Sequence, residues 1–154
     1  MRYVLNGIFL FLTLVFATAS YGAELTEESV RQIMSRLDRA VNDRNAKAVA
    51  NELSNNVSIT LNFSMRGQKQ VLKPSKQRYI SMLEQGWAKY SNYKYSRSNM
   101  TIAIKGDKAL VSAVVHESMT VQGRNVSGSA KEEVIVELVD GKPVVTGVSG
   151  QVSL

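Results

Sequence analysis

Apolar residues recur at helical spacing in two stretches of the chain. The first stretch, residues 24–42, can be capped by Thr26 and has these apolar positions on one face: Val30, Ile33, Met34, Leu37, Ala40 and Val41. A shorter apolar segment follows at 46–53. Pro74 and Ser75 then open a further stretch, whose apolar positions are Tyr79, Ile80, Met82, Leu83, Trp87 and Tyr90. The spacing predicts two amphipathic helices with a short helical segment after the first.

Apolar and polar residues alternate in the remaining segments, which is typical of strands that bury one face. One strand is predicted at 57–63, and a turn at Arg66-Gly67 would return the chain into a second strand at 70–72. Between residues 93 and 153, three turn sequences separate four long segments: Gly106-Asp107, Gln122-Gly123 and Asp140-Gly141. These segments predict an antiparallel meander, and their length and internal glycines predict strong curvature.

The apolar phase also predicts strand pairing, because a slip of one residue would turn every side chain to the other face. A two-residue turn at Gly106-Asp107 sets Ile104, Ile102 and Met100 beside Ala109, Val111 and Ala113. A similar turn at Gln122-Gly123 sets Val121, Met119 and Glu117 beside Arg124, Val126 and Gly128. For the last hairpin we prefer a three-residue loop, Asp140-Gly141-Lys142 with Gly141 left-handed, to a two-residue loop. The longer loop matches Leu138, Val136 and Val134 to Val144, Thr146 and Val148.

Residues 1–23 have the pattern of a secretory signal peptide. Arg2 supplies a positive charge, an apolar run follows at 4–16, and small residues at 17–23 suit a signal peptidase. The alternative is an uncleaved anchor, but the run is shorter than the roughly 20 residues that a membrane-spanning helix needs. We therefore expect a single domain at 24–154, periplasmic or secreted, with no stable membrane insertion after cleavage.

Composition excludes several kinds of chemistry. The chain of 154 residues has no cysteine and one histidine, which excludes disulfides, a cysteine nucleophile and a multi-histidine metal centre. We also expect no organic cofactor, because the sequence has no phosphate-binding loop and no dinucleotide fingerprint.

The chain is basic, and its positive charge is unevenly distributed. The net charge is +6, and residues 66–108 hold ten basic residues against two acids. No nucleic-acid-binding motif accompanies this segment, so we expect no nucleic-acid partner. A solvated surface is the simplest interpretation, and attraction to an anionic lipid, a polysaccharide or a small acid is the alternative.

Two carboxylates interrupt the apolar phases of the predicted meander. Glu117 shares its phase with Val115, and Glu132 shares its phase with Val134, so both should point to the concave side of the sheet. The register separates them by four residues along the ladder, on the order of 13 Å, which is too far for a carboxylate dyad. Small residues around Glu132 would leave room for a pocket: Ala113, Gly128, Ala130 and Gly150. Because a buried, unpaired carboxylate is costly, Glu132 is expected at a wet rim, in an ion pair, or as a ligand anchor or proton donor.

Aromatic residues cluster in and after the second amphipathic helix. Tyr79, Trp87 and Tyr90 share one helical stripe. Such a stripe usually packs in a core, although the polar tips of tyrosine and tryptophan also suit a pocket wall. The single histidine, His116, falls in the more polar phase with Ser112 and Ser118. We therefore expect His116 on the convex face, outside the hollow.

The order and spacing of these elements resemble the nuclear-transport-factor-2-like superfamily, also called SnoaL-like or cystatin-like. The resemblance rests on a first helix that runs into Val41-Asn42-Asp43-Arg44-Asn45-Ala46, and on hairpins with Lys105-Gly106-Asp107-Lys108-Ala109 and Asp140-Gly141-Lys142. It implies an α+β cone whose helices pack in the concave face of a strongly curved antiparallel sheet, often dimeric through that sheet. Catalytic members place an acid/base side chain, often aspartate or histidine, inside the cone, and a convex His116 departs from that pattern.

Three functions remain open at the level of the sequence. The first is a small-molecule-binding domain that holds an apolar or amphipathic ligand between helices and sheet, with Glu132, Glu117, Tyr79, Trp87 and Tyr90 as candidate ligand contacts. The second is a cofactor-free isomerase or dehydratase that uses Glu132, Glu117 and Tyr79 for proton transfer. The third is a homodimeric envelope interaction module that uses the sheet face around Ser112, His116 and Ser118.

Overall fold

The computed structural model of the protein describes residues 24–65 and 68–153, which form three helices and one six-stranded sheet. In chain order the elements are α1 (Glu27–Asn42), α2 (Ala46–Glu52), β1 (Leu53–Met65), β2 (Gln68–Leu72), α3 (Lys76–Trp87), β3 (Ser91–Lys105), β4 (Lys108–Val121), β5 (Arg124–Val139) and β6 (Lys142–Ser153). The predicted signal peptide at 1–23 and the turn at Arg66-Gly67 lie outside the described residues. The expected sequence of helices and strands is confirmed for the rest.

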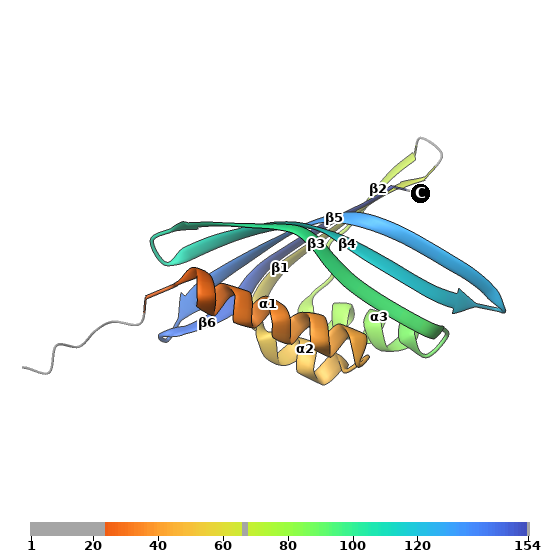
Figure 1. The fold of residues 1–154 in the computed structure, drawn as a ribbon, viewed down its shortest axis with the longest axis horizontal. Coiled ribbons are helices and arrows are strands. Elements are labelled where there is room, and N and C mark those ends of the chain that lie inside the picture. The colour runs from red at the N-terminus through yellow and green to blue at the C-terminus, as the bar shows by residue number, and fades with distance from the viewer. Residues whose placement is uncertain (1–23, 66–67, 154) are drawn as a thin grey trace, which may run out of the picture.

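The sheet is curled but not closed, and it arches over the helices (Figure 1). Its strand order is β2-β1-β6-β5-β4-β3. The expected α+β architecture is confirmed, with one amendment to the antiparallel sheet. β1 and β6 run parallel, so the sheet is mixed. A parallel pair needs a long connection, and the whole chain between β1 and β6 provides it.

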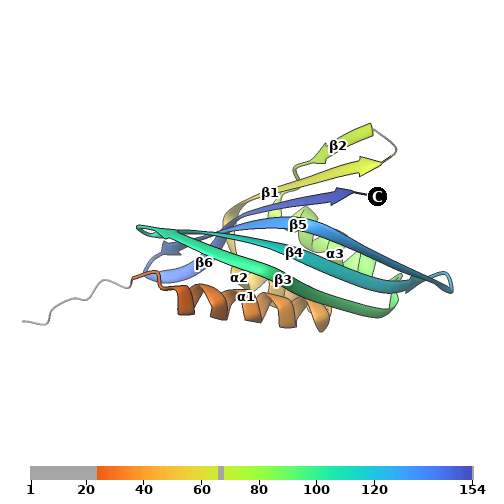
Figure 2. The same cartoon turned by 45° about the horizontal axis from the view of Figure 1, so that its top comes forward.

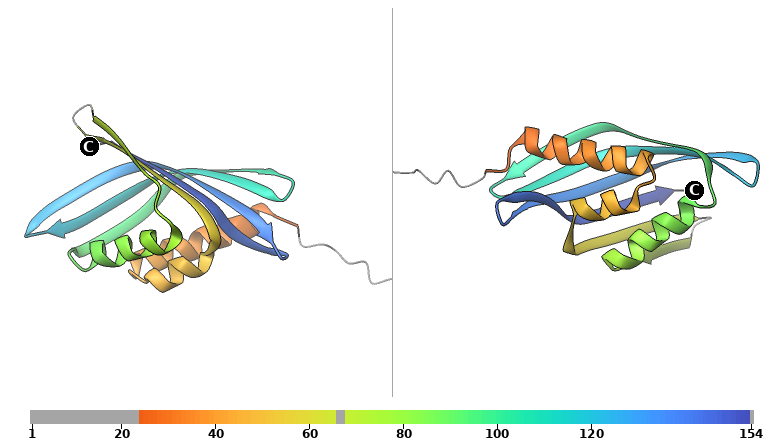
Figure 3. Two further views of the ribbon diagram at one scale, coloured as in Figure 1. Left: turned by 180° about the vertical axis from the view of Figure 1, so that it is seen from behind. Right: turned by 90° about the horizontal axis from the view of Figure 1, so that it is seen from below.

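Each helix begins at a polar residue that caps its first turn. Thr26 accepts a hydrogen bond from the Ser29 backbone, Asn45 caps α2, and Ser75 caps α3. All three helices lie on the concave side of the sheet (Figures 2 and 3). None of the helices in the described ranges is long and apolar enough to cross a bilayer. The core forms between α1 and the middle of the sheet, and its largest fully buried side chains are Val30, Ile33, Met34, Val111, Val134, Val136 and Val145.

The last hairpin differs from its predicted form. Asp140 and Gly141 both have positive φ angles, 51° and 72°, and Val139 pairs with Lys142. The loop therefore has two residues, and the predicted three-residue loop is wrong. The left-handed Gly141 is confirmed, and an irregularity in the ladder between Ile135 and Val136 restores the predicted pairing of Val134 with Val148. Aspartate tolerates the left-handed region better than most residues, which permits the tighter turn.

The hairpin of β3 and β4 contains a bulge that changes which side chains point inward. The predicted pairs of Ile104 with Ala109 and of Ile102 with Val111 are confirmed, but the ladder shifts between Ser98 and Thr101, so Met100 does not pair with Ala113. Asn99 has a φ of 52° at this point. One additional residue reverses the alternation. As a result, the earlier part of β3 presents its odd-numbered side chains to the concave side.

Candidate functional site

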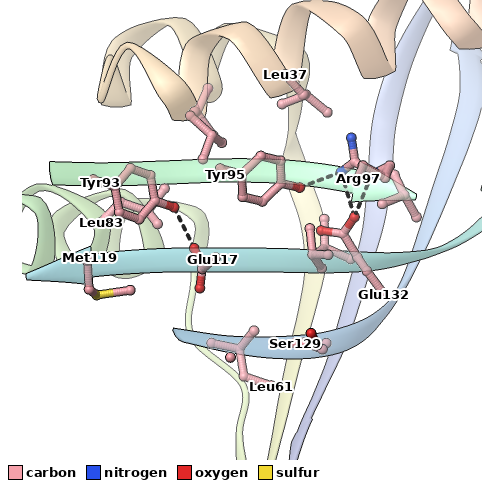
Figure 4. Close-up of a pocket in the computed structure, with 18 of the residues that line it drawn as sticks. Leu37, Leu61, Leu83, Tyr93, Tyr95, Arg97, Glu117, Met119, Ser129 and Glu132 are labelled. Carbon is pink, nitrogen blue, oxygen red and sulfur yellow. Dashed lines mark hydrogen bonds and ion pairs between the residues drawn. The ribbon is translucent and has the colours of Figure 1, made fainter. Parts of the chain in front are cut away.

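A cavity of about 290 Å³ lies between the concave face of the sheet and the helices (Figure 4). Most of its wall is apolar and includes Leu37, Val41, Leu61, Leu83, Met119 and Val148. Small residues of β5 and β6, namely Gly128, Ala130 and Gly150, leave space above the sheet. A Cβ atom placed on Gly128 would meet no atom within 4 Å, so the cavity reaches the backbone there.

Arg97 is the centre of a charged network at one end of the cavity. Its side chain is only 5% exposed, and its Nε and Nη2 atoms donate to Glu132 Oε2 over 3.2 and 2.6 Å. Nη2 also donates to the Tyr95 hydroxyl over 2.9 Å, and Nη1 donates to Asp38 of α1. The guanidinium lies 5.6 Å from the centre of the Tyr95 ring. Arg97 therefore joins β3, β5 and α1 through a single side chain.

The network keeps Arg97 positively charged. Burial lowers the pKa of Arg97, but Glu132, Tyr95 and Asp38 outweigh that effect, so the pKa is raised. Asp38 behaves differently, because burial raises the pKa of its carboxyl group more than Arg97 lowers it. Burial, followed by the nearby Glu132, raises the pKa of Tyr95, whose hydroxyl stays protonated.

A second polar group, Tyr93 with Glu117, lies beside the Arg97 network. The Tyr93 hydroxyl donates to Glu117 Oε1 over 2.5 Å. Burial and this hydrogen bond both raise the pKa of Tyr93. Trp87 and Arg44 also pack against the Tyr93 ring. The Trp87 and Tyr93 rings pack edge to face with their centres 6.3 Å apart, and the Arg44 guanidinium lies 5.7 Å from the centre of the Tyr93 ring. Tyr93 is therefore fixed in position before any ligand arrives.

Tyr79 of α3 contributes a hydroxyl group without a partner. The residue lines the cavity, and its hydroxyl makes no hydrogen bond to another described residue. Burial, then the nearby Glu132 and Glu117, raise the pKa of Tyr79. It remains a neutral phenol that can donate one hydrogen bond and accept another.

Three of the five candidate ligand contacts from the sequence line this cavity, and two do not. Glu132, Glu117 and Tyr79 line it, and the predicted positions of Glu117 opposite Gly128 and Glu132 opposite Ala113 are confirmed. Trp87, 7% exposed, packs behind Tyr93, and Tyr90 packs against Gly86. The aromatic stripe of α3 thus divides, with Tyr79 facing the cavity and Trp87 supporting it.

Four residues of the site were not predicted from the sequence. Tyr93, Tyr95 and Arg97 occupy alternate positions of β3, as the stick view shows (Figure 4). The inward phase predicted at Ile102 and Met100 falls on even-numbered residues, so without the bulge at Asn99 it did not identify these three odd-numbered positions as facing the cavity. Arg97 was instead grouped with the solvated basic segment, which is wrong for this residue. Asp38, at the border of the buried stripe of α1, carried no distinctive signal.

His116 lies on the outer face, as predicted. Its Nε2 is 2.9 Å from Ser98 Oγ and its Nδ1 is 2.7 Å from Ser129 Oγ, and the residue is exposed. It does not line the cavity. Within residues 24–65 and 68–153, no group of three acidic or histidine side chains is arranged to hold a metal ion. The polar residues that line the cavity are two glutamates, one arginine, three tyrosines and two serines, Ser127 and Ser129.

Comparisons with known proteins agree with this architecture. No protein-family model matches the chain, and no curated protein matches it. A nuclear-transport-factor-2-like protein from Cytophaga hutchinsonii is 16% identical, with a TM-score of 0.64 over 83% of this chain and 99% of that chain. A second such protein with a cystatin-like fold, from Novosphingobium aromaticivorans, is 11% identical, with a TM-score of 0.63 over 81% and 80%.

A third solved structure of this shape is a candidate scytalone dehydratase from Novosphingobium aromaticivorans. It is 13% identical, with a TM-score of 0.64 over 82% of this chain and 83% of that chain. Identities this low show a shared fold and leave the function open. The chain therefore has the nuclear-transport-factor-2-like cone fold that its sequence resembles.

Proposed function

We propose that the protein binds an apolar or amphipathic small molecule in the cavity between its helices and its curved sheet. The observation that carries this proposal is the apolar wall that ends at the unpartnered Tyr79 hydroxyl. Ligand sites are typically concave and mostly apolar, with a few polar groups that fix orientation. The tail of such a ligand would contact Leu37, Leu83 and Met119, and its head would contact the polar end.

Proton-transfer catalysis is the second candidate, and it is favoured by the presence of Glu117, Glu132 and Tyr79 in the wall of one cavity. Two observations weigh against it. Arg97 donates two hydrogen bonds to Glu132, and Tyr93 donates one to Glu117, so each carboxylate is already engaged. The raised pKa of Tyr79 makes its phenolate a rare species at neutral pH. Binding is therefore the function that the geometry supports best.

Filling the cavity tests the proposal directly. Gly128 lines the cavity and has no positive φ, so leucine can replace it without backbone strain and extends into the space. We expect Gly128→Leu to abolish the fluorescence increase of N-phenylnaphthylamine, a neutral apolar dye that the unmodified protein should bind. Lys131→Leu, an exposed position on the same strand, is the matched control and should retain binding. Equal dye binding by Gly128→Leu and the unmodified protein would contradict the proposal.

We further propose that binding takes place outside the cytoplasm, after removal of residues 1–23, and that the outer sheet face joins two copies. The support is the sequence pattern of the N-terminus and the dimerisation that the resemblance to the nuclear-transport-factor-2-like superfamily implies. N-terminal sequencing of protein from the cell envelope tests the first point. Sedimentation velocity tests the second, and a monomer at all concentrations would count against it.

A further inference from the structure

The polar end of the cavity carries more negative than positive formal charge. Arg97 is shared by two carboxylates, Glu132 and Asp38, and Glu117 adds a third with no cation of its own in the cavity wall. Among the described residues that line the cavity, Arg97 is the single basic side chain. Arg44 is engaged behind the Tyr93 ring and does not line the cavity. The chain as a whole carries a charge of +6, so this end is a local reversal of sign.

The carboxylates also keep unused hydrogen-bond acceptors. Both hydrogen bonds from Arg97 to Glu132 go to Oε2, and Tyr93 donates to Oε1 of Glu117. The second oxygen of each carboxylate accepts no hydrogen bond from a described residue. The unpartnered Tyr79 hydroxyl lies in the same cavity wall as Glu117 and Glu132.

The aromatic rings favour the same kind of ligand. Tyr79, Tyr93 and Tyr95 all line the cavity. Aromatic faces attract cations through their quadrupole, and the two guanidiniums already placed over Tyr93 and Tyr95 show that these rings accept positive charge. A carboxylate or phosphate head would instead meet the charges of Glu117 and Glu132 at close range, with Arg97 already engaged.

We propose that the ligand is a cationic amphiphile, whose ammonium head lies between Glu117, Glu132 and the tyrosines while its apolar chain lies along Leu37 and Leu83. This inference rests on the proposed function, because it specifies the head group of the molecule that the cavity binds.

A series of ligands with one chain and three heads tests the head group separately from binding itself. Octylamine, octanol and octanoate are titrated calorimetrically into the unmodified protein at neutral pH and low salt. We expect octylamine to bind about tenfold more tightly than octanol, which corresponds to the gain of roughly one favourable charge interaction, and octanoate to bind most weakly. If octanol or octanoate binds as tightly as octylamine, the head-group inference is overturned while the proposed function stands. If neither the three ligands nor N-phenylnaphthylamine binds, both fail.

A pair of variants then locates the effect. Glu117→Gln keeps an oxygen that can accept from Tyr93 but removes the charge, and we expect it to weaken octylamine about tenfold and octanol much less. Glu133→Gln makes the same charge change at an exposed position of the neighbouring strand β5, on the outer face, and should leave all three affinities unchanged. An equal loss of octylamine affinity in both variants would assign the preference to the overall charge and overturn the site.

Discussion

The inward-facing side chains of β5 have opposite environments at the two ends of the strand. Val134 is 2% exposed beneath the helices, whereas Val126 is 47% exposed near the turn to β4. Both lie in the same alternating phase and are the same residue type. Their difference shows that alternation assigns a side chain to a face, while coverage by the helices decides whether that face becomes a packed core or a cavity.

Arg97 lies at the boundary between the packed end and the open end of the concave face. Its substitution should have the largest effect on stability. Arg97→Met removes the one cation shared by Glu132 and Asp38, so two partly buried carboxylates lose their partner. We expect the free energy of unfolding to fall by about 3 kcal/mol.

Chemical denaturation at two pH values checks the reason for that loss. Acidification that protonates the unpaired carboxylates should recover part of the loss in Arg97→Met. Arg97→Lys, which keeps the charge but offers fewer directed donors, should cost less than Arg97→Met. A loss that is the same at neutral and acidic pH would show that packing, and not charge, holds this boundary together.

The two valines of β5 test the comparison itself. Val134→Ala leaves a cavity among fully packed neighbours, and we expect it to lower the free energy of unfolding by about 2 kcal/mol. Val126→Ala makes the same chemical change where the side chain is half exposed, and should cost less than about 0.5 kcal/mol. Urea denaturation of both variants measures the difference. Similar losses would mean that the open end is packed in solution, for example against a partner.

The sequence predicted the face of each strand position better than its burial. Alternation placed Glu117, Glu132 and His116 correctly, because β4 and β5 pair without interruption from Lys108 to Val121. It failed on β3, where Asn99 adopts a positive φ and inserts one residue. Asparagine often does so, but its presence alone does not locate a bulge, so the inward orientation of Tyr93, Tyr95 and Arg97 was not predicted.

The ion pair of Glu132 shows a second limit of prediction from the sequence. Its need for a partner followed from the cost of burying a charge. The identity of that partner did not, because Arg97 and Glu132 are brought together by tertiary structure across β4. The same holds for Asp38, which reaches Arg97 from α1. A local sequence pattern can therefore identify a buried charge that needs a partner without identifying that partner.

Two glycines extend the comparison to the backbone. A Cβ atom on Gly147 would lie 3.1 to 3.3 Å from the side chain of its strand partner Ile135, whereas a Cβ atom on Gly128 would meet nothing within 4 Å. We expect Gly147→Ala to destabilise the protein by about 1 kcal/mol through this contact. Gly128→Ala should stabilise it by about 0.5 kcal/mol, because alanine restricts the unfolded chain. Thermal unfolding distinguishes the two, and a stabilising Gly147→Ala would show that Ile135 moves aside freely.

The smallest effect is expected at Glu137, the outward-facing counterpart of Glu132 on the same strand. Its hydrogen bond from Thr146, followed by Lys108, lowers its pKa below the ordinary value of 4.5. A carboxyl group whose pKa is lower in the folded protein stabilises the fold above the unfolded pKa, and this contribution disappears as the pH falls through the folded pKa. Because the pair is well exposed to solvent, Glu137→Gln should cost less than about 0.5 kcal/mol at pH 7.

The pH dependence distinguishes this surface pair from the buried network. The difference in unfolding free energy between Glu137→Gln and the unmodified protein should shrink as the pH falls below 4.5 and vanish once the pH is below the folded pKa, and added salt should reduce it at pH 7. Urea denaturation across this range measures it. A cost that persists in acid would point to the geometry of the Thr146 hydrogen bond rather than to charge. In that case the stability of the outer face would depend on directed hydrogen bonds as much as that of the cavity does. Glu137 and Glu132 would then differ only in how deeply they are buried.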